Sequence, residues 1–254
     1  MRPLYAVRFF IIFFALAFCY LNAYSQAYIG GKIGFQMSKL NHDDKDYKKA
    51  YDVNFSPGYN IGAAFNIKVT ESFDLYTEIL YSKKATQIKK DDVLVKDRLV
   101  FSYFDWPLLL RTNVYKSPNY NIFLQIGPTV GYWMKGKGII ESDELLEGGF
   151  PKLKYDFKWD EETLHLMHGV NVPEANKIQL SLNIGFGSEI KLRNKHIFLV
   201  DVRYEMGHTY LSKSDEKGNY LYGYTHDFKA NNKTLMLSTA YLFNVQALRK
   251  KLMK

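Results

Sequence analysis

Apolar and polar residues alternate one by one along several segments of this chain. Side chains of a β-strand point to opposite faces in turn, so a period of two predicts a strand with one apolar and one polar face. The clearest case covers residues 178–186, where one set of positions is apolar and the other is polar or small: Ile178, Leu180, Leu182, Ile184 and Phe186 against Gln179, Ser181, Asn183 and Gly185.

Eight such segments predict an all-β fold, an eight-stranded antiparallel transmembrane up-and-down β-barrel. The expected strands cover residues 28–37, 59–68, 73–83, 101–114, 121–134, 178–192, 196–207 and 233–243. The short connections, rich in turn-forming residues, are 69–72, 115–119 and 193–195. The long polar connections are 38–58, 84–100, 135–177 and 208–232, the third with an expected short helix at 160–168. Short turns at one end and long loops at the other are typical of outer-membrane barrels.

The N-terminal segment has the pattern of a secretory signal peptide. Arg2 and Arg8 precede an apolar run at 9–21, and a small residue, Ser25, ends the segment. We therefore predict a cleaved signal peptide at 1–25, a barrel at 26–243 and a basic tail at 244–254. A lipoprotein cleavage site at Cys19 is the alternative, although bulky Phe18 stands where such sites carry a small residue.

Charge and hydropathy narrow the classes of partner. Of the formal net charge of +8, two positive charges lie in the predicted signal peptide and four in the tail, which leaves +2 for the body. Because the body has no basic face, we expect no nucleic-acid partner. No later stretch has the apolar length of a membrane helix, so a membrane-spanning chain would have to close its strands into a barrel.

Aromatic residues favour a membrane barrel over a soluble, lipocalin-like barrel. They lie near the strand ends or on the apolar face, as interfacial aromatic girdles do, although aromatic residues are common in any strand. These residues are Tyr59, Tyr81, Trp106, Tyr132, Tyr204 and Tyr241.

Charged residues recur on the opposite, polar face, which is the expected lumen. An eight-stranded barrel has an interior filled by side chains, and unpaired charges there would be costly. We therefore expect a structural plug of salt bridges, with a proton or ion path as the alternative. The residues are Lys32, Glu78, Asp105, Arg111, Glu189, Asp201, Arg203 and Glu205.

Two sets of loop residues could in principle carry chemistry. Glu161, Glu162, His165 and His168 could face one way on a helical turn, but they lack a third strong ligand at a recognisable metal spacing. His208, His226 and Asp227 flank the last long loop, where an interpretation as solvated loop residues applies. A histidine and a serine near one rim occur in lipid-modifying barrels, and the residues here are His208 and Ser212. A Gly-x-Ser-x-Gly motif is absent from the sequence. We assign no catalytic residue, cofactor or metal ligand and expect no enzyme.

One strand carries a family resemblance. The stretch Phe104-Asp105-Trp106-Pro107-Leu108-Leu109-Leu110-Arg111 resembles the acidic-apolar-Pro-Leu-Leu-x-basic strand of the PorT-like outer-membrane β-barrel family. Supporting segments are 56–62, 78–83, 127–132 and 202–207. The resemblance implies an eight-stranded barrel in the outer membrane of a Gram-negative cell, and its namesake serves type IX secretion.

The expected function is structural or interactive. Outer-membrane lipid is the expected surrounding, and the basic tail or the long loops are the expected contact with a periplasmic or outer-membrane protein. An accessory role in protein secretion is the more specific form of this hypothesis. The alternatives are a lipid-modifying barrel enzyme and, third, a narrow channel.

Overall fold

The computed structural model describes residues 26–90, 95–159, 169–218 and 220–247. Eight long strands form its body: β1 (Ala27–His42), β2 (Asp52–Lys68), β3 (Phe73–Lys90), β4 (Val95–Lys116), β5 (Tyr120–Ser142), β8 (Ile178–Lys191), β9 (Ile197–Gly207) and β12 (Ala230–Asn244). Shorter elements lie in the connections: α2 (Lys45–Ala50), α3 (Asp143–Glu147), β6 (Leu153–Trp159), β7 (Gly169–Val172), η2 (Arg193–Lys195), β10 (Tyr220–Leu221) and β11 (Tyr224–Thr225). The predicted signal peptide and most of the predicted tail lie outside the described residues.

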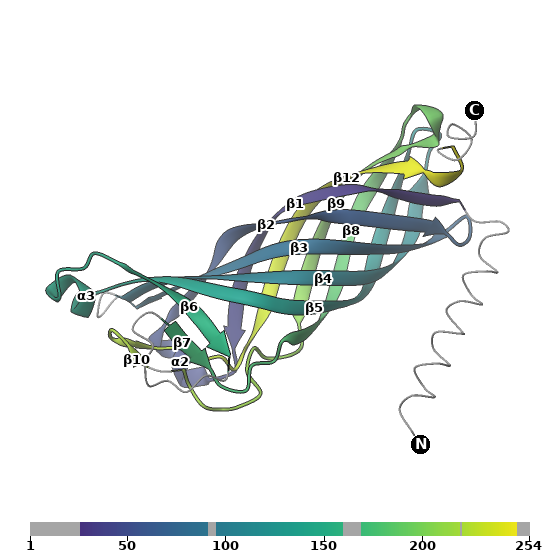
Figure 1. Ribbon diagram of the computed structural model, residues 1–254. Coiled ribbons are helices and arrows are strands. Elements are labelled where there is room, and N and C mark those ends of the chain that lie inside the picture. Colours follow the sequence, from purple (N-terminus) through teal and green to yellow (C-terminus); the bar gives the residue numbers. More distant parts are fainter. Residues whose placement is uncertain (1–25, 91–94, 160–168, 219, 248–254) are drawn as a thin grey trace, which may run out of the picture.

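The eight long strands close into a barrel, as the sequence predicts (Figure 1). Each strand pairs antiparallel with its neighbours, and the ring closes between the first and last strands, from the pair Tyr28↔Asn244 to the pair His42↔Ala230. The first and last described residues of the chain both lie at the end of the barrel that has the short turns, which we call the turn end. The opposite end is the loop end.

At the loop end the strands run further than the sequence predicts. The predictions that 38–58 and 84–100 are loops were wrong, because β2 begins at Asp52, β3 extends to Lys90 and β4 begins at Val95. The period of two continues there, but its polarity is reversed. Inward residues are apolar (Ile88, Leu99) and outward residues are charged (Lys96, Arg98). A prediction that looks for an apolar outer face therefore ends each strand where the outward residues become charged.

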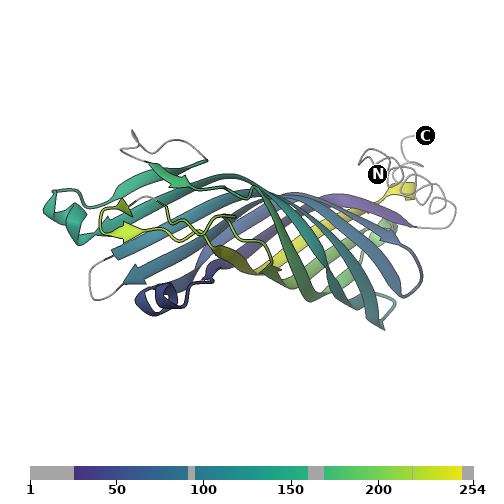
Figure 2. The same ribbon diagram turned by 90° about the horizontal axis from the view of Figure 1, so that it is seen from below.

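The extended strands carry a second body, which we call the head. It comprises the extensions of β3, β4 and β5 with α2, α3, β6, β7, β10 and β11, which fold against them (Figures 1 and 2). β6 pairs antiparallel with β5, and β7 pairs parallel with β6. The helix predicted at 160–168 lies outside the described residues. None of the helices in the described part of the chain has the length and apolar character of a membrane-crossing segment.

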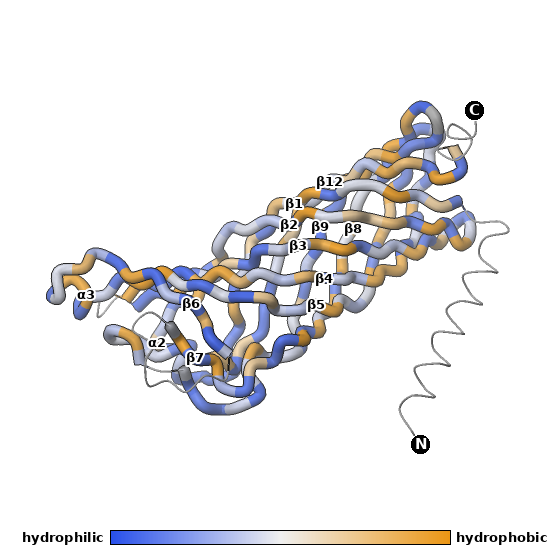
Figure 3. Tube along the Cα trace, viewed as in Figure 1, coloured by the Kyte–Doolittle hydropathy of each residue, from blue (hydrophilic) through white to orange (hydrophobic). Residues whose placement is uncertain are grey.

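Apolar residues recur at alternate positions along the barrel strands (Figure 3), and many of the large ones are exposed on the outside of the barrel. On β4, the exposed apolar positions extend from Phe104 to Val114. Ten residue steps at about 3.3 Å, tilted by about 40°, span about 25 Å across a membrane. This is the height of the apolar band of an outer-membrane barrel.

Candidate functional site: a charged lumen and a packed head

The middle of the lumen holds four charged side chains in mutual contact. Lys32 Nζ donates to Glu78 Oε1 at 2.6 Å and to Asp201 Oδ1 at 2.9 Å. Arg203 Nη2 donates to Glu78 Oε2 at 2.8 Å, and its Nε lies 3.0 Å from Asp201 Oδ2. All four side chains are buried, with at most 1% of their surface exposed. Two cations and two anions thus form a neutral cluster that closes the lumen at this level.

A second cluster lies in the lumen toward the head. Lys84 Nζ donates to Glu205 Oε1 at 2.6 Å and lies 3.2 Å from Asp105 Oδ2. The same ammonium lies 5.0 Å from the centre of the Tyr103 ring. Lys84 is therefore the shared cation of two inward carboxylates.

A third cluster lies toward the turn end. Lys68 Nζ lies 3.2 Å from both Asp74 Oδ2 and Glu189 Oε2. Arg111 Nε donates to Gln125 at 3.0 Å, and its guanidinium carbon lies 3.2 Å from the centre of the Tyr76 ring. The nearest carboxylate oxygen that pairs with Arg111 belongs to Glu189, at 3.9 Å.

These contacts confirm the inward, paired placement of the eight charges predicted on the lumen face. The sequence analysis missed three partners, Lys68, Asp74 and Lys84. A signal was present for two of them: Asp74 and Lys84 have the same strand parity as Glu78 in β3. Extending that parity toward both ends of the strand would have identified these two.

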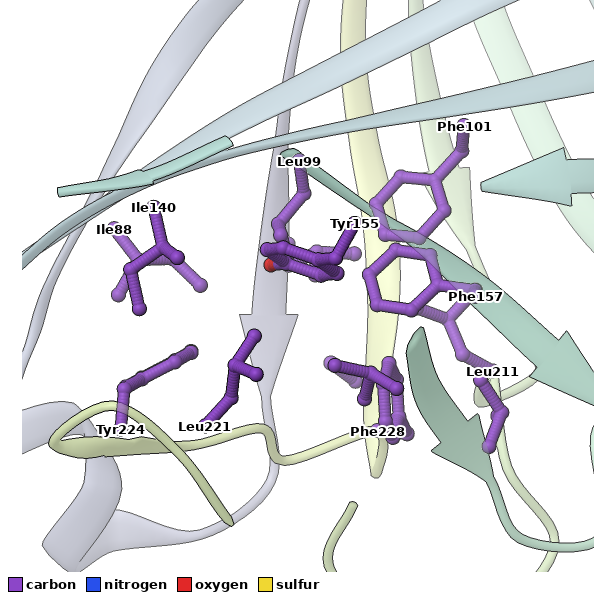
Figure 4. Close-up of a cluster of buried hydrophobic side chains, with 14 of the residues drawn as sticks. Ile88, Leu99, Phe101, Ile140, Tyr155, Phe157, Leu211, Leu221, Tyr224 and Phe228 are labelled. Carbon is purple, nitrogen blue, oxygen red and sulfur yellow. The ribbon is translucent and has the colours of Figure 1, made fainter. Parts of the chain in front are cut away.

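The head has its own buried core (Figure 4). Phe101 from β4 and Phe157 from β6 stack with ring centroids 5.5 Å apart. Trp133, fully buried, contacts both rings edge-on. Other buried members come from β3, β4, β5, the β10–β11 hairpin and the loop residues on either side of it: Ile88, Leu99, Ile140, Leu211, Leu221, Tyr224 and Phe228. The connections at the loop end are thus held by a common core.

A buried polar cluster lies inside this core. The Tyr155 hydroxyl donates to Asp97 Oδ2 at 2.5 Å and lies 2.6 Å from His226 Nε2, which is itself 3.0 Å from the same carboxylate oxygen. Burial, followed by the negative charge of Asp97, raises the pKa of Tyr155 well above its ordinary value. The phenol therefore stays protonated and donates at physiological pH.

A second polar pair joins the end of β1 to the connection between β11 and β12. His42 Nδ1 lies 3.2 Å from Asp227 Oδ2, and the backbone N–H of Lys229 donates to Asp227 Oδ1 at 2.9 Å. Burial raises the pKa of Asp227, but these two hydrogen bonds together with nearby positive charge leave the pKa below its ordinary value. Next to this pair, the hydroxyls of Tyr47 and Tyr224 contact each other.

Residues 22–213 match the family model described as outer membrane protein beta-barrel domain. The chain belongs to this family. The match and the closed barrel confirm the predicted location in the outer membrane. In outer-membrane barrels the short turns are periplasmic and the long loops extracellular, so the head lies outside the cell.

Solved structures of other outer-membrane barrels resemble this barrel at low sequence identity. Ail of Yersinia pestis, in complex with the heparin analogue sucrose octasulfate, is 14% identical, with 86% of this chain and 99% of Ail covered and a TM-score of 0.36. OprG of Pseudomonas aeruginosa is 12% identical, with 87% and 97% covered and a TM-score of 0.45. The protease OmpT of Escherichia coli is 8% identical, with 86% and 95% covered and a TM-score of 0.39. A comparison with curated proteins found no match.

Aromatic side chains border the apolar band of this outer-membrane barrel. Trp106 and Tyr132 are more than half exposed near its extracellular edge, and Tyr115 and Tyr120 pack together near its periplasmic edge. All six aromatic residues predicted to form girdles, Tyr59, Tyr81, Trp106, Tyr132, Tyr204 and Tyr241, lie on the outer face.

The loop residues singled out for chemistry are not brought together. His208 is exposed, whereas Ser212 is buried and its hydroxyl donates to the backbone oxygen of Pro173 at 2.6 Å. His226 and Asp227 join separate clusters, with Asp97 and His42. The cluster of Glu161, Glu162, His165 and His168 lies outside the described residues. Among the residues that the structure describes, no group of three or more His, Cys, Asp or Glu could hold a metal ion.

The periplasmic mouth of the barrel contains a cavity of about 460 Å³. Its lining includes Lys68 and Glu189 of the third charge cluster, together with Lys116, Lys191 and Lys195. The predicted tail begins beside this mouth, where Ala247 N donates to Asn244 Oδ1 at 3.0 Å, as at a helix N-terminus.

Proposed function

We propose that this protein is a non-enzymatic outer-membrane barrel with a closed lumen, which presents a rigid extracellular head to a protein partner. The observation that carries the proposal is the buried core of the head. Loops that served only to connect strands would have no need of nineteen buried apolar residues in one cluster. A surface held by such a core loses little conformational entropy on binding.

The far end of the head supplies a candidate contact surface, which we call the tip. Leu146 and Phe150 follow one another around α3, and Tyr220 and Tyr222 lie in the β10–β11 hairpin. All four side chains are between 40% and 62% exposed. Tyr220 donates to Glu144 Oε1 at 2.7 Å, so the hairpin and α3 form one surface. Clustered large apolar side chains exposed to water are typical of protein interaction sites.

The three buried charge clusters support a structural lumen over a channel. An ion in transit would have to displace Lys32 or Arg203 from carboxylates at 2.6–3.0 Å. Each such displacement leaves a buried charge without its partner, which is costly.

A role as a secretion accessory is the more specific form of the proposal. It is supported by the resemblance of residues 104–111 to PorT-like barrels and by a basic tail that starts at the periplasmic mouth. Asp105 and Arg111 of the resembling stretch face the lumen clusters, so the stretch supports a similar barrel interior rather than a similar partner.

Affinity purification from native outer membranes tests the proposal. A tagged wild-type chain is compared with Leu146→Ser/Phe150→Ser and with the control Lys45→Ser/Lys48→Ser, which alters exposed residues of α2 in the same head. We expect a stoichiometric partner that is lost only in the tip variant. A variant that lacks residues 244–254 tests in the same way whether the tail is needed to recover the partner. If the partner were recovered equally with both head variants, the tip would not be the contact surface.

Two assays address the alternatives. Acyl exchange on phospholipid or lipopolysaccharide that disappears in His208→Ala would favour a lipid-modifying enzyme. Single-channel conductance in planar bilayers would favour a channel and contradict a closed lumen.

A further inference from the structure

The outer face of the extracellular strand extensions is basic. Above the apolar band, lysine and arginine recur at the outward positions of β1, β3, β4 and β5, among polar residues and a few apolar ones such as Val100 and Ile139. The basic residues are Lys39, Lys83, Lys96, Arg98, Lys135 and Lys137. The only carboxylates that pair with them among the described residues are Glu141, 3.9 Å from Lys96, and Asp156, 3.4 Å from Lys137.

Three of these cations contact aromatic rings or backbone groups on the same outward surface. Lys83 Nζ lies 5.5 Å from the centre of the Tyr59 ring, and Lys39 Nζ lies 4.9 Å from that of Phe55. Arg98 Nη2 reaches down to the backbone oxygen of Pro57 at 3.5 Å. Basic and aromatic residues thus form one continuous outward surface.

The outward surface contains a groove of about 230 Å³ between β3, β4 and β5. Its lining has three cations and one anion: Gln87, Lys96, Arg98, Ile139, Glu141 and Lys152. The pairing register places Gln87, Arg98 and Ile139 side by side on the three strands. Ile139 therefore gives the groove one apolar lining residue, and its charged lining residues carry a net positive charge.

The height of the groove above the apolar band selects the kind of lipid. Lys83 and Lys135 are one outward position above Phe104, or about 5 Å, and Arg98 is six residues above Phe104, or about 15 Å. The headgroup region of an ordinary phospholipid leaflet is only about 5–7 Å thick. An occupant anchored in the band must therefore carry a headgroup that extends well beyond a single phosphate.

We propose that this groove, with Lys83 and Lys135 beneath it, binds the phosphate groups of a phosphorylated glycolipid in the outer leaflet. The acyl chains of such a lipid would cover the apolar positions of β3–β5, and its sugar-phosphate headgroup would lie along the basic surface. Basic pockets at membrane surfaces recognise anionic lipid headgroups in this way. The site is separate from the tip and goes beyond the proposed function.

The test compares a groove variant with a control of equal charge change. Lys96→Gln/Arg98→Gln/Lys152→Gln removes the three groove cations, and Lys45→Gln/Lys48→Gln/Lys49→Gln removes three exposed cations from α2, on the same head but outside the groove. Each protein is refolded into phosphatidylcholine nanodiscs containing bisphosphorylated lipid A, monophosphoryl lipid A or phosphatidylglycerol. Heat-modifiable gel mobility verifies that every variant is folded. Native mass spectrometry measures the bound lipid.

We expect the groove variant to bind bisphosphorylated lipid A more weakly than wild type by on the order of 100-fold at low salt, at roughly 1 kcal/mol per basic residue. The control should bind like wild type, and monophosphoryl lipid A should bind wild type more weakly. Equal binding by both variants would overturn the site. Equal binding of phosphatidylglycerol and lipid A to wild type would overturn the choice of a large glycolipid headgroup.

Discussion

Lys32→Met tests whether the buried charges hold the barrel together. Lys32 is the shared cation of Glu78, at 2.6 Å, and Asp201, at 2.9 Å, with both pairs fully shielded from solvent. Methionine preserves much of the side-chain volume but removes the charge, so that two carboxylates are left with Arg203 alone. Removing one partner of a buried ion pair destabilises a protein by about 3–5 kcal/mol. We expect a loss of this size in the free energy of unfolding.

Equilibrium unfolding in guanidinium, from detergent micelles and followed by tryptophan fluorescence, measures the loss. The second variant, Lys32→Met/Glu78→Gln, restores neutrality, because Arg203 Nε and Asp201 Oδ2 remain 3.0 Å apart. We expect the double variant to be less destabilised than the sum of its single changes by at least about 1 kcal/mol, as for residues in one network. A Lys32→Met barrel within about 1 kcal/mol of wild type, or strict additivity, would refute the structural plug.

Two further predictions concern the barrel and the head. Arg111→Leu should lower the unfolding temperature, with a loss of about 2 kcal/mol, because the guanidinium gives one charged hydrogen bond to Gln125 and stacks on Tyr76. An unchanged melting curve would argue against the plug. Because folding lowers the pKa of Asp227 from its ordinary value of 3.8, the carboxylate stabilises the head at pH values above 3.8. This stabilisation is lost as the pH falls through the lower pKa of the folded state. The tryptophan fluorescence of the wild-type head should therefore change as the pH falls below about 4. The Asp227→Asn variant should be destabilised at neutral pH and should lack this acid-induced change in fluorescence.

The sequence predicts the membrane-spanning half of the fold well, for a simple reason. Outward residues in contact with lipid are predominantly apolar, so Ile178, Leu180 and Leu182 form a regular pattern that a single sequence reveals. The charges between such positions had to pair inside the lumen, but which residues pair depends on the strand register. Lys32 and Asp201 are far apart in sequence and meet only because β1 and β9 flank β12.

The head could not be predicted in the same way. Its strands keep the period of two but face water outward and a core inward, so Leu99 and Phe101 occupy positions that are polar lower in the same strand, such as Asp105 and Arg111. On β5 a register shift near Met134 also changes which positions point inward, from Trp133 to Gly136. The polar clusters of the head join segments whose pairing has no local sequence signal.

The reversal of polarity implies that the head and the barrel are stabilised by separate cores, and Gly138→Ala tests this. A Cβ at Gly138 would lie 1.9 Å from Cζ of Tyr155, so the buried ring must shift and its hydroxyl must leave Asp97 and His226. The lumen clusters lie on other residues and should be untouched. Limited proteolysis of the folded protein should therefore cut the head while the heat-modifiable barrel persists. Gly31→Ala, with no atom within 4 Å of its new Cβ, is the matched control. If the head of Gly138→Ala resisted protease as well as the control does, or if the barrel unfolded with it, the two cores would not be independent.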